Sequence, residues 1–553
     1  MQVDRPEGGI APSARPGPDR GWSLNASDRP DADRGWSLNA SDRPSADRGW
    51  SLDFSVSRRI GASAGAILLT IAAAIAPATT LAAYDPAADV NSMLNTTAYT
   101  GATAWWDAGY TGRGVDVALI DTGVSPVDAL AADGKVVYGP DLSFESQAPN
   151  LTNLDTNGHG TFMAGLIAGN GSDYRGMAPG ARIVSLKVGV VDGAVDVSQV
   201  VAAIDWVVQH RNDNGLNIRV INLSYGTNSA QDYKVDPLAF AAEQAWKAGI
   251  VVVAAGGNLG FQSHMNNAPA LADPAFDPWL LAVGSSDSNG TLNPLDDTVP
   301  SFSPWPKRGA TRGVDVVAPG AHIQGLRVRN SYIDVNNPDA RVGSDYFRGS
   351  GTSESAAMMS GVVALILDKY PNATPDQVKA LLTTTGLRII GKSQAIGGGA
   401  LQLATTLVTP LPPAATARQW WAWSTGAGKL EGSRGSDHLT TDGVILDGEQ
   451  DIFGKPFDSA GMADLEAAGH SWSGGTWNGS SWSGSSWSGS SWSGSSWSGS
   501  SWSGSSWSGS SWSGSSWSGS SWSGSSWSGS SWSGSSWSGS SWSGSSWSTG
   551  AWE

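Results

Sequence analysis

The 553-residue chain has no cysteine, which excludes disulfides, thiolate metal sites and a cysteine nucleophile. Its six histidines are scattered and none belongs to an HExxH motif, so zinc-hydrolase chemistry has no support. Basic residues are few: 33 Lys and Arg stand against 49 Asp and Glu, and the formal net charge is −16. No basic stripe is visible, which argues against nucleic-acid binding, and the charge suits an exported protein.

Three short motifs place an Asp, a His and a Ser where a serine hydrolase needs them. VALIDTG holds Asp121 at the end of an apolar run, NGHGTFMAG holds His159, and GTSESAAMMSG holds Ser353. The first motif predicts a buried strand and a turn, and the stretches after His159 and Ser353 predict helices. A nucleophile at a helix N-terminus gains from the dipole and from free amide groups. The three residues can supply the carboxylate, the base and the nucleophile of a catalytic triad.

The order Asp, His, Ser and the flanking Gly and Thr residues resemble the subtilisin-like serine peptidases, from about Val90 to about Val408. The resemblance implies an endopeptidase that works through an acyl-enzyme and needs no cofactor for its chemistry. VVVAAGGN resembles the family segment whose Asn completes the oxyanion hole, which gives that role to Asn258. VINLSYG resembles the strand that pairs with an extended substrate, and AAG resembles a wall of the pocket before the scissile bond. The implied substrate-binding residues are Ser224, Tyr225, Gly226, Ala254, Ala255 and Gly256.

Between these motifs, apolar strand-like runs alternate with amphipathic or Ala-rich segments. RIVSLKV precedes SQVVAAIDWVVQHR, and NIRVINLSYG precedes DPLAFAAEQAWKAG, which IVVVAAGG follows. This alternation predicts an α/β fold with a mostly parallel sheet and helices on both faces. We expect one subtilisin-like catalytic domain over residues 84–408.

The nucleophile motif departs from the commonest family pattern, GTSMASPHVAG, at Glu354, Ala357 and Met358. Two interpretations of Glu354 are open. Its carboxylate either favours protonated His159 and moves the pH optimum upward, or complements the helix dipole and points to solvent. No thioether lies next to Ser353, so peroxide should inactivate the enzyme less readily than relatives with Met at that position.

Two N-terminal segments precede the predicted domain. Residues 58–83 contain two arginines, an apolar Ala/Ile/Leu run and a small-residue end. This is the order of a signal peptide, here cleaved near Ala82 or Ala83; a retained membrane anchor and a twin-arginine route are alternatives. Residues 1–57 carry 14-residue, low-complexity repeats that cannot form a core. They are either a long cytoplasmic region or untranslated, with the true start near Val56.

From residue 471 to residue 553 the chain becomes a WSGSS pentad, with Trp at every fifth position. A strand alternates faces with period two, so an odd repeat does not fit a simple sheet. We expect a flexible tether that displays indoles and attaches to cell-wall polysaccharide; a spacer without a binding role is the alternative. The preceding residues, 409–470, are expected to form a linker or an irregular region.

The sequence therefore predicts an exported serine endopeptidase, secreted or at the cell surface, that acts on proteins or peptides. Structural calcium is common in the family that the motifs resemble, and Asp155 and Asn157 are available, but no loop has a spacing that identifies a metal site. The competing hypothesis is a catalytically inactive surface or adhesion protein that keeps the fold as a scaffold for the tail. Glu354, and the lack of an evident propeptide after residue 84, keep that hypothesis open.

Overall fold

The computed structural model describes the catalytic region in detail. The described residues are 84–148, 150–260, 271–305, 312–391, 393–441 and 444–481, with the pairs 491–492, 500–501, 516–517, 520–521 and 551–552. The chain divides into two units, 1–78 and 79–553, and all described residues belong to the second. The predicted repeats at 1–57 and signal peptide at 58–83 lie outside them. No helix in the described part of the chain combines the length and apolar character that crossing a bilayer requires.

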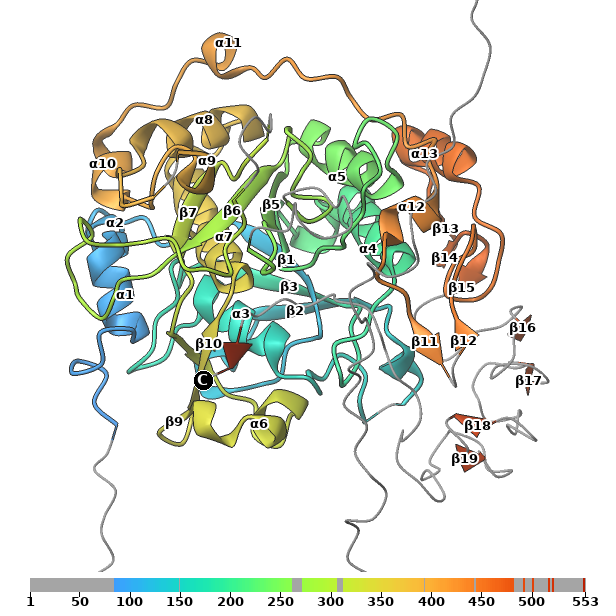
Figure 1. Cartoon of the computed structure of the whole chain (residues 1–553), viewed down its shortest axis with the longest axis horizontal. Helices are drawn as coiled ribbons and strands as arrows, with labels where there is room; N and C mark the ends of the chain where they lie inside the picture. The colour runs from blue at the N-terminus through green and yellow to red at the C-terminus, as the bar shows by residue number, and fades with distance from the viewer. Residues whose placement is uncertain are drawn as a thin grey trace, which may run out of the picture. The chain divides into compact units, whose positions relative to one another are not determined.

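A seven-stranded sheet lies at the centre of this unit, in the order β2-β3-β1-β4-β5-β6-β7 (Figure 1). Neighbouring strands in it are parallel throughout. Every residue of β1 and of β5 is buried, so both faces of the sheet are covered there and the strands are apolar runs. The strands are β1 (Asp116–Asp121), β2 (Val136–Asp141), β3 (Arg182–Lys187), β4 (Ile218–Leu223), β5 (Val251–Ala255), β6 (Leu281–Ser286) and β7 (Val316–Pro319).

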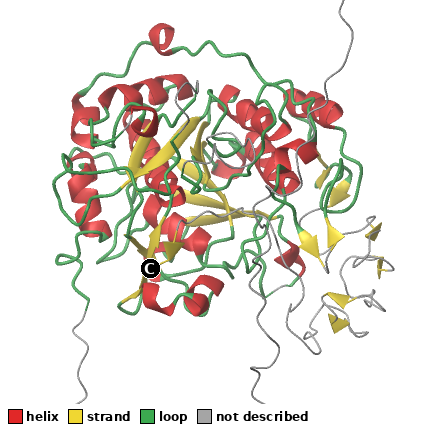
Figure 2. Cartoon of the chain, in the orientation of Figure 1, coloured by secondary structure: helices red, strands yellow, loops and turns green. Residues whose placement is uncertain are grey.

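Two pairs of helices pack on this sheet (Figure 2). α3 (His159–Ala168) packs against α7 (Thr352–Lys369), and α7 also contacts strands β4 to β7. α4 (Val197–His210) packs against α5 (Pro237–Lys247). The predicted α/β fold, with a mostly parallel sheet covered by helices, is confirmed.

Smaller elements complete the unit. A second sheet joins β20, β10 and β8, and β9 also pairs with β10. The remaining helices are α1 (Met93–Thr100), α2 (Ala102–Asp107), α6 (Tyr332–Asn336), α8 (Pro375–Thr385), α9 (Ser393–Ile396), α10 (Leu403–Val408), α11 (Ala414–Ala417), α12 (Leu430–Arg434) and α13 (Ser459–Ala468). The remaining strands are β8 (Ile323–Leu326), β9 (Arg341–Val342), β10 (Tyr346–Ser350), β11 (Thr440–Thr441), β12 (Val444–Ile445), β13 (Trp472–Ser473), β14 (Thr476–Trp477), β15 (Ser480–Ser481), β16 (Ser491–Trp492), β17 (Ser500–Ser501), β18 (Ser516–Trp517), β19 (Ser520–Ser521) and β20 (Ala551–Trp552).

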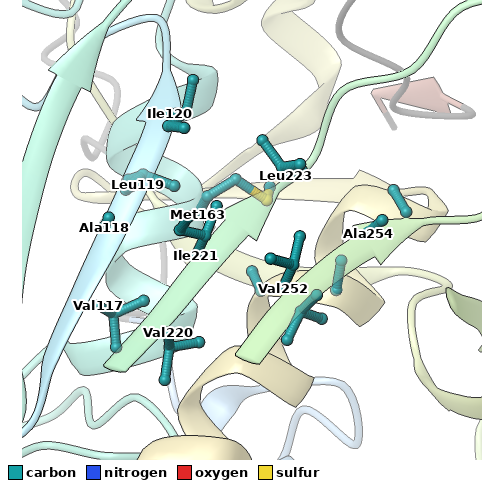
Figure 3. Close-up of a cluster of buried hydrophobic side chains, with 14 of the residues drawn as sticks. Val117, Ala118, Leu119, Ile120, Met163, Val220, Ile221, Leu223, Val252 and Ala254 are labelled. Atoms are coloured by element: carbon teal, nitrogen blue, oxygen red, sulfur yellow. The ribbon is translucent and has the colours of Figure 1, made fainter. Parts of the chain in front are cut away.

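The core between the sheet and the helices is shown in Figure 3. Leu119 of β1, Ile221 of β4, Val252 of β5 and Met163 of α3 have no exposed surface. Truncating a side chain such as Leu119 to Ala costs about 2–5 kcal/mol in a packed core. This packing fixes the carboxyl ends of β1, β4 and β5, which lie along one edge of the parallel sheet.

Residues 409–481, here called the C-terminal extension, are ordered and pack on the catalytic domain. α12 contacts α4 and α5, and α13 contacts α5. Within α12, the fully buried Arg434 donates from Nε to Asp196 Oδ2 at 2.6 Å. Where the sequence suggested a linker or an irregular region at 409–470, the chain therefore folds onto α4 and α5. The sequence shows little periodicity there because specific polar contacts, rather than a long amphipathic helix, hold the segment.

The first two pentads of the repeat tail also belong to this packed unit. Trp472 and Trp477 are only 8% and 0% exposed, and their indoles donate to Ala202 O at 2.8 Å and to Asp205 Oδ2 at 2.7 Å of α4. These two indoles are not displayed to solvent, contrary to expectation. For the later repeats, a display of indoles stays a prediction.

The first two pentads form tight hairpins. Trp477 pairs with Ser480 across the turn Asn478–Gly479, whose φ angles are 47° and 68°. Trp517 pairs with Ser520 in the same register. Positive φ at both turn positions is the geometry of a two-residue hairpin. In these first two pentads the odd repeat is compatible with strands because two of the five residues form the turn.

Candidate active site

The predicted triad residues lie at the ends of three elements that meet at one edge of the sheet. Asp121 is the last residue of β1, His159 the first of α3, and Ser353 the second of α7. α3 approaches the turn after β1 so closely that a Cβ on Gly160 would lie 2.1 Å from Gly123 O. Only glycine fits there, which explains the residue after His159 in the motif.

Asp121 and His159 form a buried, hydrogen-bonded pair. His159 Nδ1 lies 2.8 Å from Asp121 Oδ1, and both side chains are 1% exposed. Thr122 N donates to the same carboxylate oxygen at 2.8 Å. Burial opposes a positive charge on His159, but the charges of Asp121 and then of Glu354 hold the pKa of the imidazole above its ordinary value. The pair can therefore accept and hold a proton.

Ser353 lies beside the strand that was predicted to bind substrate. Its Oγ donates to Ser224 O at 3.3 Å, and Ser224 Oγ donates to Ser353 O at 3.1 Å. Ser353 is fully buried at the N-terminus of α7, where amide groups point out of the helix.

Asn258 is oriented with its donor group free. Its Oδ1 accepts from Thr352 N at 2.8 Å and from Thr352 Oγ1 at 2.9 Å. Its Nδ2 is buried and has no hydrogen-bond partner among the described residues. The amide is thus anchored by its oxygen next to the nucleophile and presents N–H groups to a developing negative charge, as an oxyanion hole requires.

Glu354 does not point to solvent, so that interpretation is wrong. The residue is 0% exposed, and neither carboxylate oxygen has a hydrogen-bond partner in the described part of the chain. Burial raises the pKa of this carboxyl to about 7, against the lowering effect of His159. α7 is covered on all sides by the sheet and α3, so even its first turn lies in the interior.

The six residues predicted to bind substrate lie together at the same edge of the sheet. Ser224, Tyr225 and Gly226 follow β4, while the alanines of the second group end β5 and Gly256 comes next. The two groups meet at Ala272, whose N donates to Gly256 O at 2.9 Å and whose Cβ lies 2.7 Å from the position of a Cβ on Gly226. Tyr225 is only 1% exposed, so it can meet substrate through its backbone rather than its ring.

Asp155 and Asn157, named as available calcium ligands, are already engaged by the protein. The Asp155 carboxylate accepts from Thr122 Oγ1 at 2.8 Å and from the amides of Gly158 and Thr161, each at 2.7 Å. Asn157 Oδ1 accepts from His159 N at 3.2 Å, and its Nδ2 donates to Val191 O at 2.9 Å.

Asp155 therefore braces the turn after Asp121 against the start of α3, a positioning role that the sequence analysis missed. Its place four residues before His159 was the available signal. No group of three or more His, Asp or Glu side chains within the described ranges could hold a metal ion.

Comparisons with known proteins identify similar sequences and structures. The model of the Subtilase family matches residues 112–409. Serine protease AprX of Bacillus subtilis is 39% identical over 283 residues, covering 49% of this chain and 61% of that protein. Subtilisin DY of Bacillus licheniformis is 34% identical over 298 residues, covering 53% of this chain and 91% of that protein. Fervidolysin of Fervidobacterium pennivorans, a solved structure, matches at 29% identity with a TM-score of 0.46, over 59% of this chain and 48% of that one.

Proposed function

Since this chain belongs to the subtilase family, we propose that it is a serine endopeptidase that cleaves proteins or peptides through an acyl-enzyme. One observation carries the proposal: the buried Asp121–His159 pair lies at the sheet edge where Ser353 opens α7 and where Asn258 presents an unpaired amide. Leaving the Asn258 donor unpaired costs about 1–3 kcal/mol, a cost that a role in binding an oxyanion explains.

The reaction follows from these positions. Ser353 Oγ attacks the scissile carbonyl carbon while His159 Nε2 takes its proton. Asp121 holds the imidazole by Nδ1 and stabilises its charged form. The tetrahedral oxyanion accepts from Asn258 Nδ2 and Ser353 N. His159 then gives its proton to the leaving amine, and water attacks the acyl-enzyme by the reverse sequence. No cofactor takes part in these steps.

The substrate backbone pairs in an extended conformation with Ser224–Gly226, and the side chain before the scissile bond enters the pocket beside Ala254–Gly256. These assignments rest on the position of both segments next to Ser353. Main-chain pairing gives affinity for extended chains of many sequences, which suits an endopeptidase.

Labelling with a fluorophosphonate probe tests the activity. The probe reacts with an activated serine and needs no knowledge of the substrate. We expect labelling of the full chain and none of the Ser353→Ala variant. A correctly folded chain that stays unlabelled would favour the alternative, a catalytically inactive surface or adhesion protein.

Export and attachment complete the proposal. The charged, apolar and small-residue order at 58–83 supports secretion or a place at the cell surface, and the later WSGSS repeats supply regularly spaced indoles for cell-wall polysaccharide. Because the first two pentads pack on α4, the informative truncation removes residues 482–553 only. We expect it to keep fluorophosphonate labelling and to lose retention on cell-wall material; unchanged retention would refute the attachment.

A further inference from the structure

Residues 418–424, here called the tryptophan strap, run along the outside of the molecule between α11 and α12 (Figure 1). The strap carries three indoles at the surface. Trp420 is 76% exposed, Trp421 53% and Trp423 39%. Exposed aromatic surface of this extent marks binding sites in folded proteins.

The backbone of the strap is fixed on both sides of the two most exposed indoles. On one side, Gln419 donates to the Asp376 carboxylate from N at 3.3 Å and from Nε2 at 3.0 Å. On the other, Ser424 N donates to both carboxylate oxygens of Glu243, at 2.9 and 2.8 Å. The indoles are therefore presented by a rigid support, which lowers the entropic cost of binding a ligand.

Trp423 has a structural role that the other two indoles lack. Its ring stacks on Trp279, with centroids 3.5 Å apart and planes 5° from parallel, and Lys247 Nζ lies 4.3 Å from its centroid. Trp279 in turn donates from Nε1 to Ala422 O at 3.2 Å. Packing thus explains the third indole and leaves Trp420 and Trp421 without an explanation.

Two grooves flank these two residues. One has a volume of about 530 Å³ and the other of about 1020 Å³, and both are lined by Gln419, Trp420 and Trp421. Such volumes are those of ligand sites. A linear polymer that crosses the two indoles would occupy both grooves.

Positive charge gathers around the smaller groove. Arg219, Lys247 and Arg418 line it, and the nearby carboxylates are Asp376, which already accepts from the strap, and Glu243, which lies 3.9 Å from Lys247 Nζ and outside the lining. Arg418 lies 4.1 Å from the centroid of Trp420 and has no ion pair with any residue that the structure describes. In a chain whose net charge is −16, this local excess of cations selects for an anionic ligand.

We propose that the tryptophan strap and its two grooves bind an acidic polysaccharide. The C–H faces of the sugar rings stack on Trp420 and Trp421, and the carboxylates of the polymer pair with Arg418 and Lys247. A proline-rich peptide would also stack on the indoles, but it would leave Arg418 without an anionic partner, whereas Lys247 already pairs with Glu243 at 3.9 Å. The site is separate from the repeat tail, which has no charged side chain from residue 471 to residue 552, and it does not depend on peptidase activity.

Native affinity electrophoresis tests the proposal on the full chain, with Ser353→Ala in every sample to prevent autolysis. Gels contain polygalacturonate, uncharged methylcellulose or no polymer, at low and at high salt. We expect polygalacturonate to retard the parent and salt to reverse this. The Trp420→Ala/Trp421→Ala variant should bind at least tenfold more weakly, and Arg418→Gln should lose several-fold affinity and part of the salt dependence. Tyr332→Ala, at an exposed aromatic outside both grooves, is the matched control and should behave like the parent.

Fluorophosphonate labelling of the same variants with Ser353 restored checks that they fold. Equal retardation of the parent and the double tryptophan variant would overturn the proposal, as would equal binding of both polymers, which is the result expected if only the uncharged tail binds. Retention of the parent on poly-L-proline without retardation by polygalacturonate would replace the polysaccharide with a protein partner.

Discussion

The catalytic centre and the C-terminal extension both bury polar side chains, but they pair them differently. At the centre, Asn258 Nδ2 and both oxygens of Glu354 have no partner among the described residues. In the extension, the Arg434 guanidinium meets the Asp196 carboxylate and two backbone carbonyls, those of Gly448 at 2.6 Å and Gln450 at 2.5 Å.

This difference distinguishes residues that are expected to affect function from residues that are expected to affect stability. A buried polar atom without a partner destabilises the folded state by about 1–3 kcal/mol, so it persists only where another requirement maintains it. At the centre, the proposed mechanism supplies that requirement, because it uses the Asn258 donor and is sensitive to the charge of Glu354. In the extension, the fully paired Arg434 guanidinium holds α12 on α4 through Asp196. Substitutions at the centre should therefore change rates and pH dependence, and those in the extension should change the free energy of unfolding.

The largest effect is expected from breaking the pair between the extension and α4. Arg434→Met leaves the Asp196 carboxylate buried and uncompensated, which should destabilise the fold by about 3–5 kcal/mol. Scanning calorimetry in the Ser353→Ala background measures the loss without autolysis. Adding Asp196→Asn removes the stranded charge but keeps a side-chain oxygen to cap α4, so the double variant should recover part of the stability. A double variant no more stable than Arg434→Met would contradict the saturation argument.

At the catalytic centre, Asn258→Asp sharpens the comparison because it removes the donor and keeps the oxygen that accepts from Thr352. Loss of one oxyanion donor should lower kcat about 10²–10³-fold. KM should change little, since the donor acts only in the transition state, whereas the melting temperature should fall because the new carboxylate oxygen is buried without a donor. Steady-state kinetics on a denatured protein substrate measure kcat and KM separately. A kcat near that of the parent would remove Asn258 from the mechanism.

The same contrast explains what the sequence could predict. Asp121, His159 and Ser353 each sit in a short motif at a strand end or a helix start, so local pattern located them, and the alternation of strands and helices predicted the fold. The contacts that hold the extension join residues far apart in the chain: 238 positions separate Arg434 from Asp196, and 272 separate Trp477 from Asp205. No local pattern encodes such pairs.

The burial of Glu354 could have been predicted from the sequence, unlike these long-range contacts. Its helix is apolar or small on every side, as the consecutive residues Ala356, Ala357, Met358 and Met359 show, which is the pattern of a helix with no solvent face. The interpretation that Glu354 points to solvent considered only the helix dipole at the first turn. It did not consider what packs around the helix.

A smaller effect should follow from Trp477→Phe, which removes the indole donor to Asp205. Burial raises the pKa of Asp205, which lies beside the buried carboxyl of Glu466, to about 7, so Asp205 is more ionised at pH 8 than at pH 5. The raised pKa means that stability is lost as pH rises through 7. Loss of a hydrogen bond to a charged group costs about 1.5–3 kcal/mol, so the destabilisation should be larger at pH 8 than at pH 5. Trp472→Phe, which loses a donor to a neutral carbonyl, is the control and should show no such pH dependence.

The smallest expected effect concerns Glu354, where a substitution changes one charge next to His159. As pH rises through about 7, the Glu354 carboxyl ionises, and its charge, with that of Asp121 and of the neighbouring Asp155, keeps the proton on His159. The acid limb of the kcat/KM profile marks the pH at which His159 loses its proton. These charges therefore keep that limb at high pH. Glu354→Gln should move that limb down by about one pH unit, equivalent to about 1.4 kcal/mol, with the plateau little changed.

Two further variants separate charge from packing at this position. Glu354→Met is also neutral, so it should shift the acid limb in the same direction, and it should make the enzyme sensitive to peroxide, which the parent resists. Because a raised carboxyl pKa removes stability as pH increases, both neutral variants should gain more melting temperature at pH 8 than at pH 5. Unshifted acid limbs in both would mean that the buried carboxyl stays protonated during turnover. Glu354 would then be a buried packing residue, and the contrast with the fully paired Arg434 would rest on Asn258 alone.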